Sequence, residues 1–349
     1  MPKEITHWLI AEETARRLVS CSDADSPDDD TTKTALEAFP VLIHLGALLH
    51  DVLYYVRSGK ADVGRCTKLA NALHGADGED TFGLLRDLLS FRHSTIQGGG
   101  EGALRAFLLG ALTHICTDAV FHPYIYYTAG NYVEKSTHFQ AWYNHRALES
   151  AIDLAFCREQ GISLRTFSLG NDLRVGKHEM QFFLRHLAAL QRQAPELWAI
   201  EATDYENGYT TLAWLRVLFA SSPINVVLDV AESIMTPFLQ LQAFAELHSY
   251  LGLRYSGRSP WSGIQTQTTL HYTHPVSGEN YRTTLQELFE SAVQESIRVW
   301  GILEPMLVEK TGAALIPEQG KSLEVGLLGV ASSEMRYFAP MFSALEKRK

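Results

Sequence analysis

Apolar residues recur at helical spacing along most of the chain, and neither an internal repeat nor an alternating βαβ order is visible. The spacing predicts helices over about residues 5–20, 67–73, 81–91, 140–160, 179–194, 211–220, 226–250 and 285–308. A further helical region over 31–56 is interrupted by Pro40 and is apolar on every side after it. A helix that is apolar all round is typical of the centre of a bundle. The predicted fold class is all-α.

Three polar segments separate these helices. Residues 22–30 form a Ser/Asp/Pro segment with five aspartates, predicted as a solvated loop, and 98–102 form a glycine-rich connector. Residues 254–284 are rich in Ser, Gly, Thr and Gln and are predicted mainly as a long ordered loop, with a strand or hairpin as the alternative near 266–272. We expect a metal-binding helical core over 1–165 and a helical region over 166–349 that packs on it.

Composition limits the classes of partner. The 349 residues are 46% hydrophobic and carry a formal net charge of −10, which disfavours nucleic acid because phosphate contacts need clustered Lys and Arg. The four cysteines are widely spaced and are expected to be reduced thiols. The N-terminus has no apolar secretory core, and the sequence contains no uncharged apolar run of ~20 residues that would indicate a membrane span. These features predict a cytoplasmic protein.

The most informative segment lies in the apolar helical run that begins near Ala103. His114, Asp118 and His122 are spaced at i, i+4 and i+8, so their side chains are displaced by only roughly 40° and about 6 Å per step and share one face. A carboxylate on an apolar face is costly to bury unless a cation lies against it. The triplet therefore indicates a metal site. Because Pro123 biases the preceding residue away from helical geometry, the helix is expected to end at His122.

Five other potential ligands lie elsewhere in the chain, and nitrogen and oxygen donors without thiolates suit a catalytic zinc site. They are His7 in the first helix, Asp51 near the end of the apolar region, His93 between two helices, and His145 and Glu149 one helical turn apart. A lone histidine on an apolar helix is more often a hydrogen-bonded core residue. We assign that role to His44, His50, His74, His178, His186 and His248, and a surface position to His271 and His274.

The order of these motifs resembles the zinc-dependent phospholipase C family, which includes secreted bacterial phosphatidylcholine-cleaving enzymes and the catalytic domain of glycosylphosphatidylinositol-specific phospholipase D. P1-type nucleases are more distant relatives. The matching motifs are Thr6-His7, the segment from Gly46 to Tyr54 with Asp51, His93-Ser94, H-x-x-x-D-x-x-x-H at 114–122, and His145-x-x-x-Glu149. They cover about residues 5–155. The resemblance implies an all-helical bundle of the phospholipase C/P1 nuclease type, here with a helical C-terminal extension.

The resemblance also implies a metal centre of two to three zinc ions. Asp51, His93, His114 and Asp118 would surround one zinc, and Asp118 would bridge to a second zinc held by His7. A third would be bound by His122, His145 and Glu149. A metal-bound hydroxide would attack phosphorus, and Asp51 would orient or deprotonate the attacking water. The bacterial enzymes complete one site with an N-terminal tryptophan, which has no counterpart upstream of His7 in this sequence.

The expected activity is hydrolysis of a phosphoester by a phospholipase C-like phosphodiesterase acting on a small molecule or a phospholipid head group. Two alternatives remain open from the sequence. A P1-type nuclease or nucleotidase would use the same metals, although the acidic charge disfavours it. A non-catalytic metal-binding scaffold would keep the bundle with degenerate sites.

Overall fold

A computed structural model of the protein describes residues 3–21, 27–57, 62–90, 100–134, 136–191, 200–235, 238–239, 241–256, 259–308, 316 and 318–340. Within these residues the all-α prediction is confirmed, with thirteen α-helices and one two-stranded sheet. The helices are α1 Glu4–Cys21, α2 Pro27–Ala38, α3 Pro40–Gly46, α4 Val63–Leu73, α5 Gly83–Ser90, α6 Gly100–Ala129, α7 His138–Gln160, α8 Leu169–Val175, α9 Lys177–Gln191, α10 Ala202–Phe219, α11 Ser222–Met235, α12 Gln242–Leu251 and α13 Leu285–Val308.

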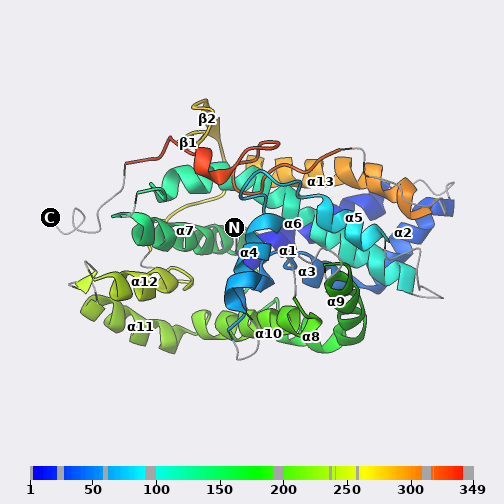
Figure 1. Ribbon diagram of the computed structural model, residues 1–349, viewed down its shortest axis with the longest axis horizontal. Helices are drawn as coiled ribbons and strands as arrows, with labels where there is room; N and C mark the ends of the chain where they lie inside the picture. Colours follow the sequence, from blue (N-terminus) through cyan, green and yellow to red (C-terminus); the bar gives the residue numbers. More distant parts are fainter. Residues whose placement is uncertain are drawn as a thin grey trace.

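Helix α6 is the central element, and most of its residues are buried. It contacts α1, α2, α3, α7 and α13, which surround it along its length (Figure 1). Its apolar composition on every side follows from this position. By length and composition alone α6 passes as a membrane span, but 89% of its most apolar window is buried inside the protein. The bent pair α10 and α11 passes the same test only when the two helices are counted together.

The predicted helical region 31–56 is broken into separate elements. Helix α2 already begins at Pro27, inside the segment predicted as a loop, and Pro40 starts α3. A proline fits the first turn of a helix because that turn has no acceptor for its N–H. Helix α3 ends at Gly46, and the chain turns through 47–51 before the 3₁₀ helix η1, Val52–Tyr55. The prediction of an apolar helix through this stretch was therefore wrong, and the turn places Asp51 at the end of the segment.

Glycines allow α3 and α6 to touch. A Cβ atom at Gly46 would overlap the carbonyl oxygen of Phe107, and one at Gly110 would overlap that of Ile43. The two backbones approach more closely than side chains would permit. This contact brings the turn after α3 against the part of α6 that carries His114.

The C-terminal half packs on this core. Helix α13 contacts α6 and α1, while α10 contacts η1. In Figure 1 α13 runs along α6, while α8, α10 and α11 follow one another along the opposite side and α12 lies beside α11. The segment predicted mainly as a loop contains a hairpin, in which β1 Leu270–Thr273 pairs antiparallel with β2 Asn280–Thr283. The domain boundary at residue 165 stays a prediction.

Candidate metal centre

Helix α6 buries three potential metal ligands on one face. His114 and Asp118 are 0% exposed and His122 is 1% exposed. Their spacing of four residues aligns them along the helix, as the sequence predicts. Buried groups of this kind need partners from neighbouring elements.

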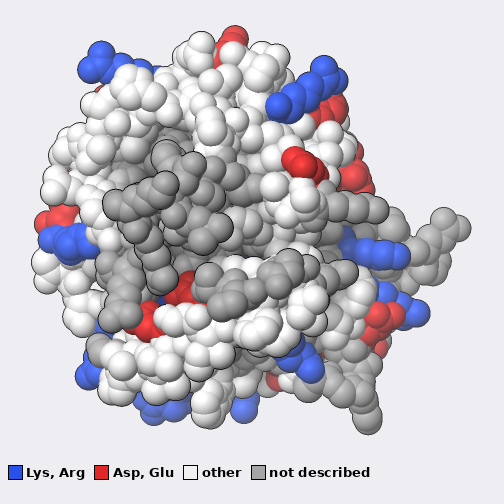
Figure 2. All heavy atoms as spheres, turned by 90° about the vertical axis from the view of Figure 1, so that its left-hand side faces the viewer, with Lys and Arg blue, Asp and Glu red and all other residues white. Residues whose placement is uncertain are grey.

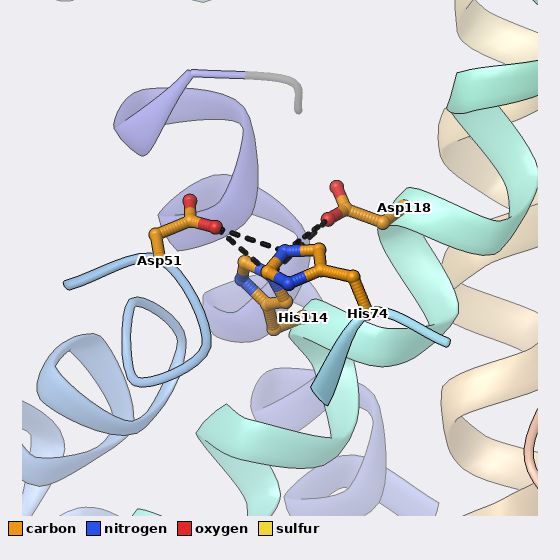
Figure 3. Close-up of side chains that lie close together, drawn as sticks. All are labelled: Asp51, His74, His114 and Asp118. Carbon is orange, nitrogen blue, oxygen red and sulfur yellow. Dashed lines mark hydrogen bonds and ion pairs between the residues drawn. The ribbon is translucent and has the colours of Figure 1, made fainter. Parts of the chain in front are cut away.

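The first group of potential ligands consists of Asp51, His74, His114 and Asp118, whose donor atoms lie within 4.8 Å of one another. Figure 3 shows Asp51 from the turn after α3 and His74 from the end of α4 facing the two residues of α6. His114 Nε2 lies 3.1 Å from Asp118 Oδ2 and 3.5 Å from Asp51 Oδ1. His74 Nε2 lies 3.2 Å from Asp51 Oδ1 and 3.8 Å from Asp118 Oδ2. Two carboxylates and two imidazoles thus face one point.

The second group consists of His122 on α6 with His145 and Glu149 on α7. Glu149 Oε1 lies 2.7 Å from His145 Nε2, and the rings of His122 and His145 are 5.5 Å apart. The ring of Tyr126 packs edge-on against both histidines. These residues form a compact buried set of two nitrogen donors and one carboxylate.

Asp118 connects the two groups and His7. Its Oδ2 faces His114, whereas its Oδ1 lies 3.3 Å from His7 Nε2 and 3.8 Å from His122 Nε2. The ring of His7 stacks on that of His114, with centroids 4.2 Å apart. A carboxylate that presents its two oxygens to different sets of imidazoles has the arrangement of a bridging ligand.

Helix α7 also fixes the position of His7. Asp153, which is fully buried, accepts hydrogen bonds from Thr6 N at 2.9 Å, Thr6 Oγ1 at 2.6 Å and Ile5 N at 3.2 Å. The first N–H groups of a helix lack acceptors within it, and a carboxylate placed there satisfies them. Asp153 therefore holds the first turn of α1, which carries His7.

Hydrogen bonds to the second ring nitrogen orient most of these histidines. In three of them Nδ1 lies 2.6 or 2.7 Å from a main-chain carbonyl oxygen: His74 contacts Ala70, His114 contacts Ala47, and His122 contacts Leu323. A carbonyl can only accept, so Nδ1 carries the proton and Nε2 of the neutral ring keeps its lone pair. In His145 Nδ1 lies 2.6 Å from the hydroxyl of Tyr132. This pattern is typical of metal-binding histidines.

Several facing atoms make no hydrogen bond of suitable geometry among the described residues, although His7 Nε2 and His114 Nε2 lie at ion-pair distance from Asp118. This set of buried atoms comprises both ring nitrogens of His7, Nε2 of His114 and His122, and both oxygens of Asp118. Leaving such atoms unsatisfied is costly, and a cation among them removes the cost. The donors present therefore fit a divalent metal such as zinc.

Burial and charge shift the pKa values of most of these groups in the sense that suits metal binding. His114 is the exception: burial opposes its protonation, but Asp118 and Asp51 raise its pKa to about 9. Burial lowers the pKa of His7, and it lowers those of His122 and His145 well below the usual value. Burial alone would raise the pKa of Asp118, but the neighbouring histidines hold it well below its usual range. Neutral imidazoles beside an ionised carboxylate are the protonation states that bind a cation.

Seven of the eight residues singled out from the sequence fall in or beside these groups: His7, Asp51, His114, Asp118, His122, His145 and Glu149. The eighth, His93, lies outside the described residues. In the described part of the chain His74 joins Asp51, His114 and Asp118. Its assignment as a core histidine missed this role. The signal was its place at the end of a helix, directly before Gly75, whose φ of 67° turns the chain away.

Other histidine assignments also need correction. His50 is buried as expected, but neither ring nitrogen has a hydrogen-bond partner among the described residues, and its ring stacks on His114 with centroids 4.7 Å apart. Burial lowers its pKa well below the usual value, so a neutral ring packs there. His178 is exposed, whereas His274, expected at the surface, is buried and lies 3.0 Å from the carbonyl oxygen of Val325.

Helix α6 continues past His122, contrary to the prediction that Pro123 would end it. A proline inside a helix removes the N–H that would bond to the carbonyl four residues earlier, here that of Ala119. Gly326 packs against this carbonyl oxygen and against the Pro123 ring, so closely that a Cβ atom would overlap the oxygen. Packing of Gly326 thus covers the Ala119 carbonyl that lacks its helical hydrogen bond, and His122 stays on the same helix face as Asp118.

Comparison of the sequence with known proteins identifies its family. A family model described as zinc dependent phospholipase C matches residues 6–195, more than half of the chain. The matched region contains His7 and every residue of both groups. Neither a curated protein nor a solved structure matches the chain. The chain belongs to the zinc-dependent phospholipase C family.

Proposed function

We propose that this protein is a zinc-dependent phosphodiesterase that cleaves a phosphoester bond in a phospholipid head group or a small phosphodiester. One observation carries the proposal. Asp118 lies between two buried sets of imidazoles and carboxylates, with unsatisfied oxygens directed to both. Family membership supports the same class of chemistry.

Two to three zinc ions fit these donors. Asp51, His74, His114 and Asp118 would hold one ion, His122, His145 and Glu149 would hold another, and His7 with Asp118 offers a further partial site. Bound zinc would supply Lewis-acid stabilisation of phosphate oxygens and activation of the attacking water.

The protein's own side chains would orient the attacking water molecule and keep bulk water out of the site. Asp51 is 6% exposed and contributes Oδ1 to the first group, so its second carboxylate oxygen would be the one to accept a proton from a water molecule there. Tyr126 and Tyr132 pack around the second group, where their rings keep bulk water from its histidines. A dry site strengthens every charge interaction within it.

Surface charge favours a small or lipid phosphoester over a nucleic acid. The chain carries a net charge of −10. On the face shown in Figure 2, the Lys and Arg side chains of the described residues lie scattered around the rim and do not gather into a track. A nucleic-acid backbone would need such a track.

The test combines metal analysis with a substrate panel. Purified protein is expected to contain at least two zinc ions per chain and to hydrolyse a p-nitrophenyl phosphodiester and a phospholipid head group faster than single-stranded DNA or RNA. Fewer than two tightly bound metals would favour a scaffold without catalysis. Faster cleavage of nucleic acid would favour a nuclease.

A further inference from the structure

A short segment far outside the matched region reaches the metal centre. The family match ends at residue 195, whereas residues 322–326, termed the clasp below, lie in the C-terminal segment drawn in red in Figure 1. Leu323 N donates to the carbonyl of His74 at 2.8 Å, and the carbonyl of Leu323 accepts from His122 Nδ1 at 2.6 Å. These two histidines belong to different groups. One peptide segment therefore contacts a potential ligand of each.

The clasp is a closed turn with a buried interior. Gly326 N donates to the carbonyl of Ser322 at 2.8 Å, and Ser322 N donates to the carbonyl of Leu327 at 2.9 Å. Ser322, Leu323 and Val325 are 0% exposed. A turn that satisfies its own backbone and buries its side chains holds its remaining peptide groups in fixed directions.

Hydrogen bonds on both sides attach the clasp to the chain around the site. Thr81 Oγ1 donates to the carbonyl of Lys321 at 2.8 Å, and Ser332 N donates to that of Ala76 at 2.8 Å. His274, after β1, contacts the carbonyl of Val325 at 3.0 Å. One of these bonds reaches Ala76, in the turn that follows α4 and positions His74, and another reaches Thr81, between that turn and α5.

Gly326 is where the backbone of the clasp packs against the backbone of α6. Its φ of 66° is in the left-handed region, and a Cβ atom would overlap the carbonyl oxygen of Ala119. Ala119 lies one residue after Asp118 and three before His122. Any side chain at 326 would push the clasp away from α6 and lengthen the bond between Leu323 and His122.

We propose that the clasp is a positioning part of the metal centre. Leu323 fixes the tautomer and the ring direction of His122 and anchors the main chain of His74, so that both Nε2 atoms converge on their groups. Partners of this kind typically change metal affinity by roughly 10–100-fold. The inference rests on the proposed metal binding, and it makes the C-terminal region necessary for a complete site.

Two glycine substitutions test the proposal. Gly326→Ala and Gly329→Ala introduce the same methyl group at the same φ of 66°, but the methyl group at 329 meets no atom within 4 Å. Zinc affinity, measured by competition with a chromophoric chelator, is expected to fall by about 10-fold or more in Gly326→Ala and to stay at the wild-type value in Gly329→Ala. Equal zinc affinities in the two variants would overturn the proposal.

A measurement on the wild-type protein covers the case in which Gly326→Ala does not fold. Coupling between two sites is reciprocal, so zinc must stabilise the clasp if the clasp favours zinc. Hydrogen–deuterium exchange of the peptides spanning 320–330 is expected to slow when zinc is added to metal-free protein. If zinc binds and exchange there is unchanged, the clasp has no such role. If zinc does not bind at all, the proposed function itself fails.

Discussion

At the scale of single residues, the electrostatics of Asp118 decide what the site can bind. A fully buried carboxylate is costly unless cations or hydrogen-bond donors face it. Here its neighbours are His7, His114 and His122. Burial lowers the pKa values of His7 and His122, whereas Asp118 and Asp51 raise that of His114 to about 9 against its burial. The neutral rings of His7 and His122 offer lone pairs rather than charge. A metal ion is the partner that satisfies all of these groups together.

Asp118→Asn tests this arrangement directly. The amide keeps the size of the side chain but loses the charge and one acceptor oxygen, so metals on both sides lose a ligand. Zinc affinity and phosphodiesterase activity are expected to fall together, by more than the roughly 100-fold typical of an outer partner. Helicity, followed by circular dichroism, should be retained. Full activity in this variant would rule out the proposed role of Asp118.

Tyr132→Phe tests the outer partner of His145. The substitution removes the hydroxyl that lies 2.6 Å from His145 Nδ1. Zinc affinity is expected to fall about 10-fold because the ring loses its orienting bond. Tyr124→Phe is a control, since Tyr124 is a buried tyrosine of α6 whose ring contacts Tyr272 rather than a potential ligand. A similar loss of affinity in both variants would contradict a specific role for Tyr132.

The sequence predicts ligands well where one helix carries them and poorly where a turn does. His114, Asp118 and His122 follow from helical spacing alone. His74 does not, because its direction depends on the chain turning at Gly75 and on the hydrogen bond from Leu323, 249 residues later. The glycine after His74 is visible in the local sequence, but the contact with Leu323 is not.

At the scale of elements, the site depends on how helix ends are anchored. Helix α1 begins against Asp153 of α7, and α3 ends in a turn that gives His114 its carbonyl partner. The positions where helices end thus determine the site as much as the helices themselves do. Periodicity predicts the long α6, α7 and α13, but it does not show that an apolar run such as 41–55 breaks at Gly46, because the cause is close backbone contact with α6.

Asp153→Ala is expected to destabilise the junction of α1 and α7. It leaves Ile5 N and the Thr6 hydroxyl without their acceptor, which typically costs about 1–3 kcal/mol, and leaves Thr6 N with only the carbonyl of Lys3. Asp153→Asn keeps one acceptor oxygen and should lose less. Urea unfolding monitored by circular dichroism compares the two. An alanine variant as stable as the wild type would show that Asp153 does not act as this cap.

His44 provides a pH-dependent link between helices. It lies on α3, 2.9 Å from Glu12 of α1 and 3.1 Å from Asp172 of α8. Burial opposes its protonation, but these two carboxylates raise its pKa from 6.5 to about 9. Because the folded pKa lies above the unfolded value, the stabilisation is complete below pH 6.5 and is lost as the pH rises through 9.

The expected result is a fall in unfolding free energy, at most about 3 kcal/mol, between about pH 6 and about pH 10. Added salt should reduce it because Glu12 is half-exposed. His44→Gln should flatten this part of the profile in urea titrations. An unchanged pH profile in that variant would assign the dependence to other groups.

At the scale of the whole molecule, the metal centre joins segments that are distant in sequence. His7 lies in α1, Asp51 in the turn after α3, His74 at the end of α4, and the remaining potential ligands in α6 and α7, while Leu323 approaches from the C-terminal segment. The sequence predicts the bundle and most donors but not this last contact, because a main-chain carbonyl has no signature in sequence. Metal binding should therefore stabilise the whole fold rather than one helix.

Thermal unfolding with and without zinc measures this coupling. A ligand that binds only the folded state at about 100 times its Kd stabilises it by roughly 2.7 kcal/mol per site. Protein stripped with a chelator and then reloaded should thus unfold several degrees higher than the metal-free protein, since roughly 2–4 °C corresponds to 1 kcal/mol in mid-sized domains and less in larger ones. Asp118→Asn should lose most of this shift, because it removes the ligand shared between groups. If that variant gains as much from zinc as the wild type, the metals that stabilise the fold are bound elsewhere.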